Sequence, residues 1–187
     1  LNGANCSFNT EACGGVHIIN LNGDILERRL FNFFEYPPFP AFSIIATADG
    51  HYLACGLEVL PGDNPPDYDK LQMWMMKVKP NGDTLWVKQY DDPDEEDEDA
   101  NDILETPGKD GYYLQGDVGK DFHYFYKTLI RTDLNGNALW RKDIKNGNAY
   151  MMLGNMILLS SNDKLTMAYE SGPGVGYFKT WVSVLDT

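Results

Sequence analysis

The 187-residue sequence lacks the runs that mark several large protein classes. No apolar stretch approaches the roughly 18 residues that a membrane-spanning helix needs, and no charged start followed by a short apolar segment suggests a signal peptide. Basic residues are few, because 15 Lys and Arg stand against 28 Asp and Glu and give a formal charge of −13. This balance argues against nucleic acid and anionic membrane surfaces as partners, since binding to phosphate groups needs a basic surface.

Signatures of catalysis and of transition-metal binding are missing too. The histidines are scattered without a His-x-x-x-His pair, and the cysteines contain no Cys-x-x-Cys, so we expect no zinc site. There is no Gly-x-Ser-x-Gly, and the glycine-rich 171–178 opens a strand rather than a helix, which favours a plain loop over a phosphate-binding one. Cys55 lies in an apolar run and is interpreted as a buried thiol, while Cys6 and Cys13 could close a small loop. We therefore expect a protein without catalytic activity.

A turn followed by a tryptophan recurs along the chain. "VKPNGDTLWVKQY" (78–90) resembles "RTDLNGNALWRKDI" (131–144) and, more loosely, "INLNGDILERRL" (19–30). An Asn-Gly pair between two strand-like runs predicts a hairpin with a type I′ turn, in which both central residues have positive φ. The first copy is degenerate, because Leu26-Glu27 stands where the others have Leu-Trp.

Two further segments recur at similar spacings. "TADGHYLACG" (47–56) matches "GKDGYYLQGD" (108–117) and, weakly, "SSNDKLTMAY" (160–169). Trp74, Thr128 and Trp181 occupy one position at spacings of 54 and 53 residues. The runs are β-branched, aromatic and alternating, which predicts strands. "MMLGNMILL" (151–159) is expected to be a buried strand because the repeat register requires one there.

These patterns predict an all-β fold of β-propeller-type repeats, each a four-stranded antiparallel blade. The expected units within one domain, 1–187, are 1–30 (partial), 31–90, 91–144 and 145–187 (partial). A propeller has at least about four blades, and roughly three and a half units are visible. Because both ends fall within a motif, we expect part of a larger propeller; an oligomer or a divergent first blade are the alternatives.

The repeat resembles that of secreted bacterial β-propeller proteins, which are abundant in Bacteroidota and often carry a C-terminal type IX sorting signal. The stretches that carry the resemblance are "ADGHYLACG", "KDGYYLQG", "MMKVKPNGDTLWVKQY" and "LIRTDLNGNALWRKDI". The resemblance covers roughly residues 15–187 and implies a propeller fold and an extracellular or cell-surface location. No sorting domain is present in the sequence, and the resemblance implies nothing about activity.

The acidic run "DDPDEEDEDAND" (91–102) is a candidate calcium site, placed between an outer and an inner strand. Its spacing Asp97-x-Asp99-x-Asn101 imitates the start of a calcium-binding loop, and Ca²⁺ prefers such oxygen ligands. However, position six is Asp102 rather than Gly, and no bidentate Glu follows at position twelve. The alternative is a solvated loop of mutually repelling charges.

Two aromatic and proline-rich insertions interrupt the repeat, "NFFEYPPFPAF" (32–42) and "LPGDNPPDYDK" (60–70). Unlike the repeated tryptophans, which we expect to pack between blades, these segments occur once, and loops on a rigid scaffold commonly carry recognition. The candidate partner-binding residues are Phe33, Phe34, Tyr36, Phe39 and Tyr68.

The sequence therefore predicts a non-catalytic extracellular scaffold that binds a protein or glycan, or that forms a subunit of a larger surface assembly. The alternative is a propeller enzyme, such as a quinoprotein-like oxidoreductase or a glycan-cleaving enzyme. That alternative requires acidic, histidine or arginine side chains converging at a central channel.

Overall fold

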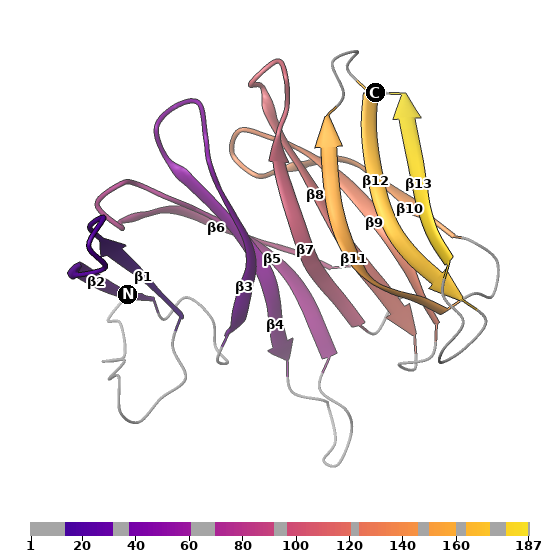
Figure 1. Ribbon diagram of the computed structural model, residues 1–187, viewed down its shortest axis with the longest axis horizontal. Coiled ribbons are helices and arrows are strands. Elements are labelled where there is room, and N and C mark those ends of the chain that lie inside the picture. The colour runs from indigo at the N-terminus through magenta and orange to yellow at the C-terminus, as the bar shows by residue number, and fades with distance from the viewer. Residues whose placement is uncertain are drawn as a thin grey trace.

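The computed structural model describes residues 14–31, 38–60, 70–91, 97–120, 124–145, 150–159, 164–172 and 179–186. The regular structure in these ranges consists of strands, as expected (Figure 1). The strands fan out from a hairpin near the N-terminus to the C-terminal sheet (Figure 1). In the described ranges, no helix is long and apolar enough to cross a membrane.

Thirteen strands are described, and they form three sheets. They are β1 (Gly14–Ile19), β2 (Ile25–Phe31), β3 (Pro38–Ala46), β4 (Tyr52–Leu60), β5 (Lys70–Val78), β6 (Thr84–Tyr90), β7 (Asp97–Glu105), β8 (Gly111–Lys120), β9 (Tyr124–Asp133), β10 (Ala138–Ile144), β11 (Tyr150–Leu159), β12 (Lys164–Gly172) and β13 (Lys179–Asp186). β1 pairs with β2, β11–β12–β13 form a second sheet, and the eight strands from β3 to β10 form the third.

The eight-stranded sheet consists of two antiparallel meanders. β3–β4–β5–β6 lies within the expected unit 31–90, and β7–β8–β9–β10 lies within 91–144. A single parallel pairing, Leu71 with Asp97, joins them. The expected strand at 151–159 is confirmed as part of β11. The all-β, antiparallel prediction is thus confirmed.

The Asn-Gly turns differ from the predicted type I′ turn. In the turn 79–83, the amide of Gly82 donates to the carbonyl of Lys79, and the amide of Lys79 donates to the carbonyl of Asp83. Only the glycine has positive φ, at 84° in Gly82, while Asn81 does not. These are three-residue loops, in which a type I turn is followed by a left-handed glycine. The extra residue shifts the register between β5 and β6.

In the structure, the repeated hairpins at 47–56 and 108–117 align one residue differently from the sequence match, which superposed Asp49-Gly50 on Asp110-Gly111. The hairpin loop is one residue longer in the second meander, because Thr47 closes on His51 whereas Thr106 closes on Gly111. Beyond the loop, Gly56 pairs with Trp74 and Gly116 pairs with Thr128. Tyr52 is therefore equivalent to Tyr112, 60 residues later, whereas the sequence match placed Tyr52 against Tyr113. The shared position of Trp74, Thr128 and Trp181 is confirmed. Trp181 pairs with Tyr169 on β12, as Trp74 and Thr128 pair with Gly56 and Gly116 on the corresponding strands.

The core lies between the two meanders and between the second meander and β12, because both faces of each meander are apolar. One cluster joins β4–β6 of the first meander to β7–β9 of the second, and it contains Leu53, Cys55, Met73, Met75, Tyr90, Ala100, Ile103, Tyr112, Leu114, Val118 and Ile130. A second cluster joins Tyr113 and Leu129 to Leu165 and Met167 of β12. Successive residues of β8 thus face opposite clusters, as a strand buried on both faces requires. Cys55 is a buried free thiol, as expected.

Trp86 also packs against the cluster between the meanders, which is the role expected of a repeated tryptophan. Its ring centroid lies 6.3 Å from that of Tyr112 on β8. A Cβ added at Gly136 would approach Trp86 Cζ3 to 2.9 Å, so the indole lies directly against the 133–137 turn of the second meander.

Replacing Gly116 with alanine tests the close approach of both β7 and Met73 of the first meander to this glycine. An added Cβ would collide with the carbonyl oxygen of Asp99 and would lie 2.7 Å from Met73 Cε. We expect Gly116→Ala to reduce the free energy of unfolding by about 2 to 3 kcal/mol, because overpacking forces the backbone to shift. Urea denaturation followed by tryptophan fluorescence measures this. Gly108→Ala is the control, since the nearest atom there is a side-chain oxygen of Asp110 at 3.3 Å; equal midpoints for the two variants would contradict the prediction.

Candidate functional site

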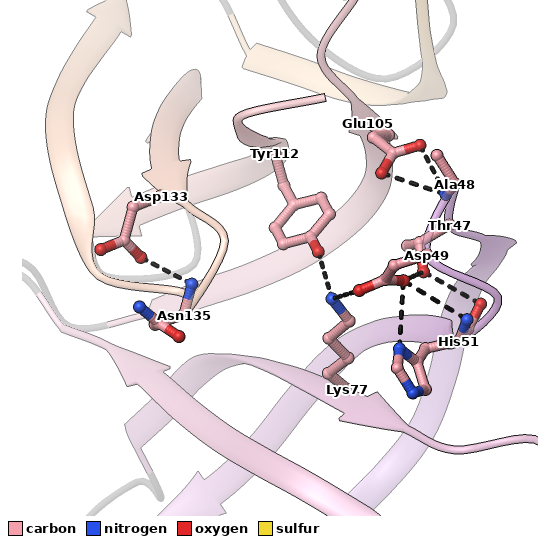
Figure 2. A network of polar contacts seen from close by, with 9 residues as sticks. All are labelled: Thr47, Ala48, Asp49, His51, Lys77, Glu105, Tyr112, Asp133 and Asn135. Carbon is pink, nitrogen blue, oxygen red and sulfur yellow. Dashed lines mark hydrogen bonds and ion pairs between the residues drawn. The ribbon is translucent and has the colours of Figure 1, made fainter. Parts of the chain in front are cut away.

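The most developed polar site surrounds Lys77 at the junction of the two meanders. Its ammonium lies 2.6 Å from Asp49 Oδ2 and donates to the Tyr112 hydroxyl at 2.7 Å (Figure 2). Lys77 projects from β5, Asp49 from the turn before β4, and Tyr112 from β8 of the next meander. Asp49 also accepts from the Thr47 hydroxyl at 2.6 Å, and His51 Nδ1 lies 3.1 Å away from it. One cation therefore connects two repeat units.

The charge states in this site follow from its hydrogen bonds. Burial would raise the pKa of Asp49, but hydrogen bonds from Lys77, Thr47 and His51 outweigh burial and lower that pKa well below its ordinary value. Burial would lower the pKa of Lys77, but bonds to Asp49 and Tyr112 outweigh it and raise that pKa. Burial raises the pKa of Tyr112. At neutral pH the site is thus an ion pair capped by a neutral phenol.

The same ion pair recurs in the second meander. Arg131 stands 54 residues after Lys77, and its Nη2 lies 2.7 Å from Asp110 Oδ1. Asp110 accepts from the Thr106 hydroxyl at 2.7 Å, as Asp49 does from Thr47. A pair that is repeated in both meanders supports the sheet frame rather than a single reaction centre.

Further polar contacts run between the meanders. Glu105 of β7 accepts from the Ala48 amide at 2.9 and 3.1 Å (Figure 2). The Tyr90 hydroxyl at the end of β6 donates to the carbonyl of Gly136 at 2.8 Å. The turn that contains Gly136 is closed locally, since the Asn135 amide donates to Asp133 Oδ1 at 2.8 Å. These bonds fix how one unit lies on the next.

The acidic run is not the continuous loop that the sequence predicted. Strand β7 begins at Asp97, so residues 97–102 pair with β8, and Asp97 and Glu98 are buried. Specific donors make this possible. Asp97 Oδ1 accepts from the Leu71 amide at 3.3 Å, and Glu98 forms an ion pair with Arg141 at 2.8 Å. Because each of these buried carboxylates has a donor, the run continues as a strand.

A second carboxylate lies beside Asp99 in this region. Asp99 Oδ1 accepts from Asn101 Nδ2 at 2.7 Å and from the Asp117 amide at 3.1 Å. The Asp117 carboxylate lies 2.5 Å from the fully buried ammonium of Lys127. Burial and the Asp117 charge raise the pKa of Asp99 to about 7, and burial raises that of Asp117. Two carboxylates thus share a desolvated site with a single cation.

The structure brings some predicted site residues together and leaves others undescribed. Asp99 and Asn101 are in contact, whereas Asp97 is directed to the amide of Leu71. Among the residues that the structure describes, no three His, Cys, Asp or Glu side chains are grouped so that they could hold a metal ion. The calcium hypothesis stays a prediction, because residues 92–96 of the run lie outside the described ranges.

The aromatic candidates fall mostly outside the described residues. Phe33, Phe34, Tyr36 and Tyr68 belong to the undescribed ranges, and for Phe39 the structure gives the backbone of β3 alone. Their role in binding stays a prediction.

Sequence reasoning missed the Lys77 site, although a signal for it existed. The basic residues Lys77 and Arg131 occupy the same position of the repeat. An Asp, Asp49 or Asp110, stands in the hairpin turn before the preceding strand in each case. Comparisons with protein-family models and with curated proteins find no match for this chain. The described side chains therefore carry the functional argument, and their contacts are those of stacked strands.

Replacing Lys77 tests whether this ion pair connects the units. Lys77→Met keeps most of the side-chain volume but leaves the buried Tyr112 hydroxyl without its partner, so we expect a loss of about 1 to 3 kcal/mol in the free energy of unfolding. Urea denaturation measures the change. Lys79→Met, at an exposed turn position, is the control. A Lys77→Met midpoint equal to that of the control would refute the linking role.

The raised pKa of Asp99 predicts an unusual pH dependence. Because its folded pKa, about 7, exceeds the ordinary 3.8, the folded state binds the proton more tightly, and the contribution of Asp99 to stability should increase as pH falls from about 8 to 5. We expect Asp99→Asn to be more stable than wild type at pH 8 and to lose most of this slope. Urea midpoints at several pH values test it, with Asp83→Asn in an exposed turn as control. Parallel pH profiles for wild type and Asp99→Asn would disprove the prediction.

Proposed function

We propose that this chain is a set of β-propeller-type blades that serves as an extracellular scaffold for binding a protein or glycan partner. The observation that carries the proposal is the repeated face-to-face packing of the meanders. Met75 on β5 is buried against the second meander, and Leu129, 54 residues later, is buried against β12. Units that bury equivalent positions against their successors are what radial stacking of blades requires.

The use of charged residues supports a scaffold rather than a reaction centre. Asp49, Asp110, Asp117 and Glu98 are each paired with a basic side chain of the same sheet frame. Charges paired in this manner define the register of strands and units, since removing one partner leaves the other poorly solvated. A binding role needs such rigidity, because ordering a flexible surface on association costs affinity.

The two aromatic insertions are the proposed ligand-binding elements. Pro38 pairs with Glu58, and Leu60 pairs with Lys70, so the strand ends that flank segments 32–37 and 61–69 lie at the same end of the sheet. Phe33, Phe34, Tyr36, Phe39 and Tyr68 are the proposed binding residues of these insertions. Aromatic residues are enriched in binding surfaces because they bury a large area at low entropic cost.

The extracellular location and the membership of a larger surface assembly rest on the resemblance of the repeat and on the charge. A net charge of −13 favours solubility and partners with basic or neutral surfaces.

Glycan and peptide arrays probed with the labelled 187-residue chain test the binding function. We expect capture by a defined subset of ligands, and at least a tenfold loss in a variant with Phe33, Phe34 and Tyr36 changed to serine. Leu139→Ser is the control, because Leu139 is 60% exposed and belongs to β10 of the second meander. Array signals that are absent, or unchanged in the triple variant, would refute the proposal.

A further inference from the structure

A pocket of about 280 Å³ lies between β1 and the neighbouring face of the eight-stranded sheet. Its walls are residues 17–19 of β1, Ile44, Tyr52 and residues 78–80 at the start of the β5–β6 turn. Most of these side chains are apolar, and His17, Lys79 and the Tyr52 hydroxyl provide polar atoms. A small, mainly apolar pocket with few polar groups is the usual form of a ligand site.

The repeat identifies what occupies this space elsewhere in the molecule. Trp86 pairs with Lys77 across β5–β6, and Trp140 pairs with Arg131 across β9–β10. In the first hairpin the corresponding pair is Glu27 with Ile18. Glu27 therefore stands at the position of the repeated tryptophan, and its side chain leaves the same face of the hairpin as that of Ile18, which lines the pocket.

The walls of the pocket correspond to the surroundings of Trp86. That indole lies against Tyr112 and against the 133–137 turn. Tyr52 is the equivalent of Tyr112, and the 79–83 turn is the equivalent of 133–137. Tyr52 and the first residues of that turn both line the pocket. The pocket thus has the tyrosine and turn that receive an indole, without the tryptophan.

The pocket is also open to solvent on the β3 side. Ile103 on β7 is 2% exposed because the first meander covers it, whereas Ile44, at the equivalent place on β3, is 59% exposed. Tyr52 is 41% exposed. A side chain can therefore enter the pocket across β3 without opening of the sheet.

We propose that this pocket binds the indole ring of a tryptophan side chain presented by a protein partner. The two internal tryptophans that occupy the equivalent space, Trp86 and Trp140, stand on extended strands, and an extended partner segment would present its tryptophan in the same manner. This inference rests on the proposed binding function and specifies one chemical class of ligand for it.

Titration of the full chain with N-acetyl-tryptophanamide, followed by amide chemical shifts in NMR spectra, tests the proposal. For a ligand of this size we expect a Kd on the order of 0.1 to 1 mM, with shifts concentrated at Ile18, Ile44 and Val78. N-acetyl-leucinamide should bind at least tenfold more weakly. Absence of binding, or equal binding of the two amides, would overturn the proposal.

Variants then locate the site. Glu27→Trp places an indole in the pocket from within the chain, so we expect a higher thermal midpoint and at least a tenfold loss of ligand affinity, while Glu27→Gln should keep its affinity within twofold. Should Glu27→Trp fail to fold, Ile44→Glu at the mouth should weaken binding at least fivefold, with Leu139→Glu, similarly exposed, as control. Affinity retained in folded Glu27→Trp, or in Ile44→Glu, would refute the site.

The two proposals fail separately. Binding of N-acetyl-tryptophanamide without capture on any array would refute the insertion-based function and leave the pocket intact. Capture on arrays without binding of the amide would refute the pocket alone.

Discussion

The structure depends on one constraint, which is that a sheet with two apolar faces must be covered on both. β8 shows it most clearly, because Tyr112 and Leu114 face the first meander whereas Tyr113 faces β12. Burial of apolar surface contributes about 25 cal/mol per Å², and a single four-stranded sheet cannot bury both faces by itself. Stacking covers both faces of the second meander, one by the first meander and the other by β12. The arrangement of polar residues, turns and pockets then follows from where these stacked faces meet.

Polar side chains at the stacked faces fix how the units fit together. Apolar contact alone would allow one sheet to slide over another, because it has little directional preference. The Lys77 ammonium, held between Asp49 and Tyr112, favours the observed alignment of β5 with β8. The same reasoning applies to the Tyr90 hydroxyl on the Gly136 carbonyl. Desolvating these groups costs stability, and what they provide in return is a unique register.

The strands could be predicted from the sequence because hairpin signals and alternating apolar residues are local properties of the chain. The predicted turn type was wrong because the loop has three residues rather than two. Lys79 closes on Asp83, and of the Asn-Gly pair only Gly82 has positive φ. The acidic strand was missed because its partners, among them Arg141 and the amide of Leu71, are distant in sequence and meet it only in the folded sheet. The match of Tyr52 to Tyr113 failed because Lys109, at a φ of 54°, belongs to a longer loop.

A repeat is informative at the position where it is broken. Equivalent positions in stacked units face the same packing problem, so selection for stability alone favours the same solution at each. Glu27 replaces a tryptophan, and Ile18 replaces the basic residue of the repeated ion pair, within one cross-strand pair. Two changes in one contact remove both the indole and the cation from a junction whose tyrosine, Tyr52, is retained. Departures from local consistency are expected at functional sites, and a retained wall beside a lost occupant is the pattern that recognition of an external aromatic group would produce.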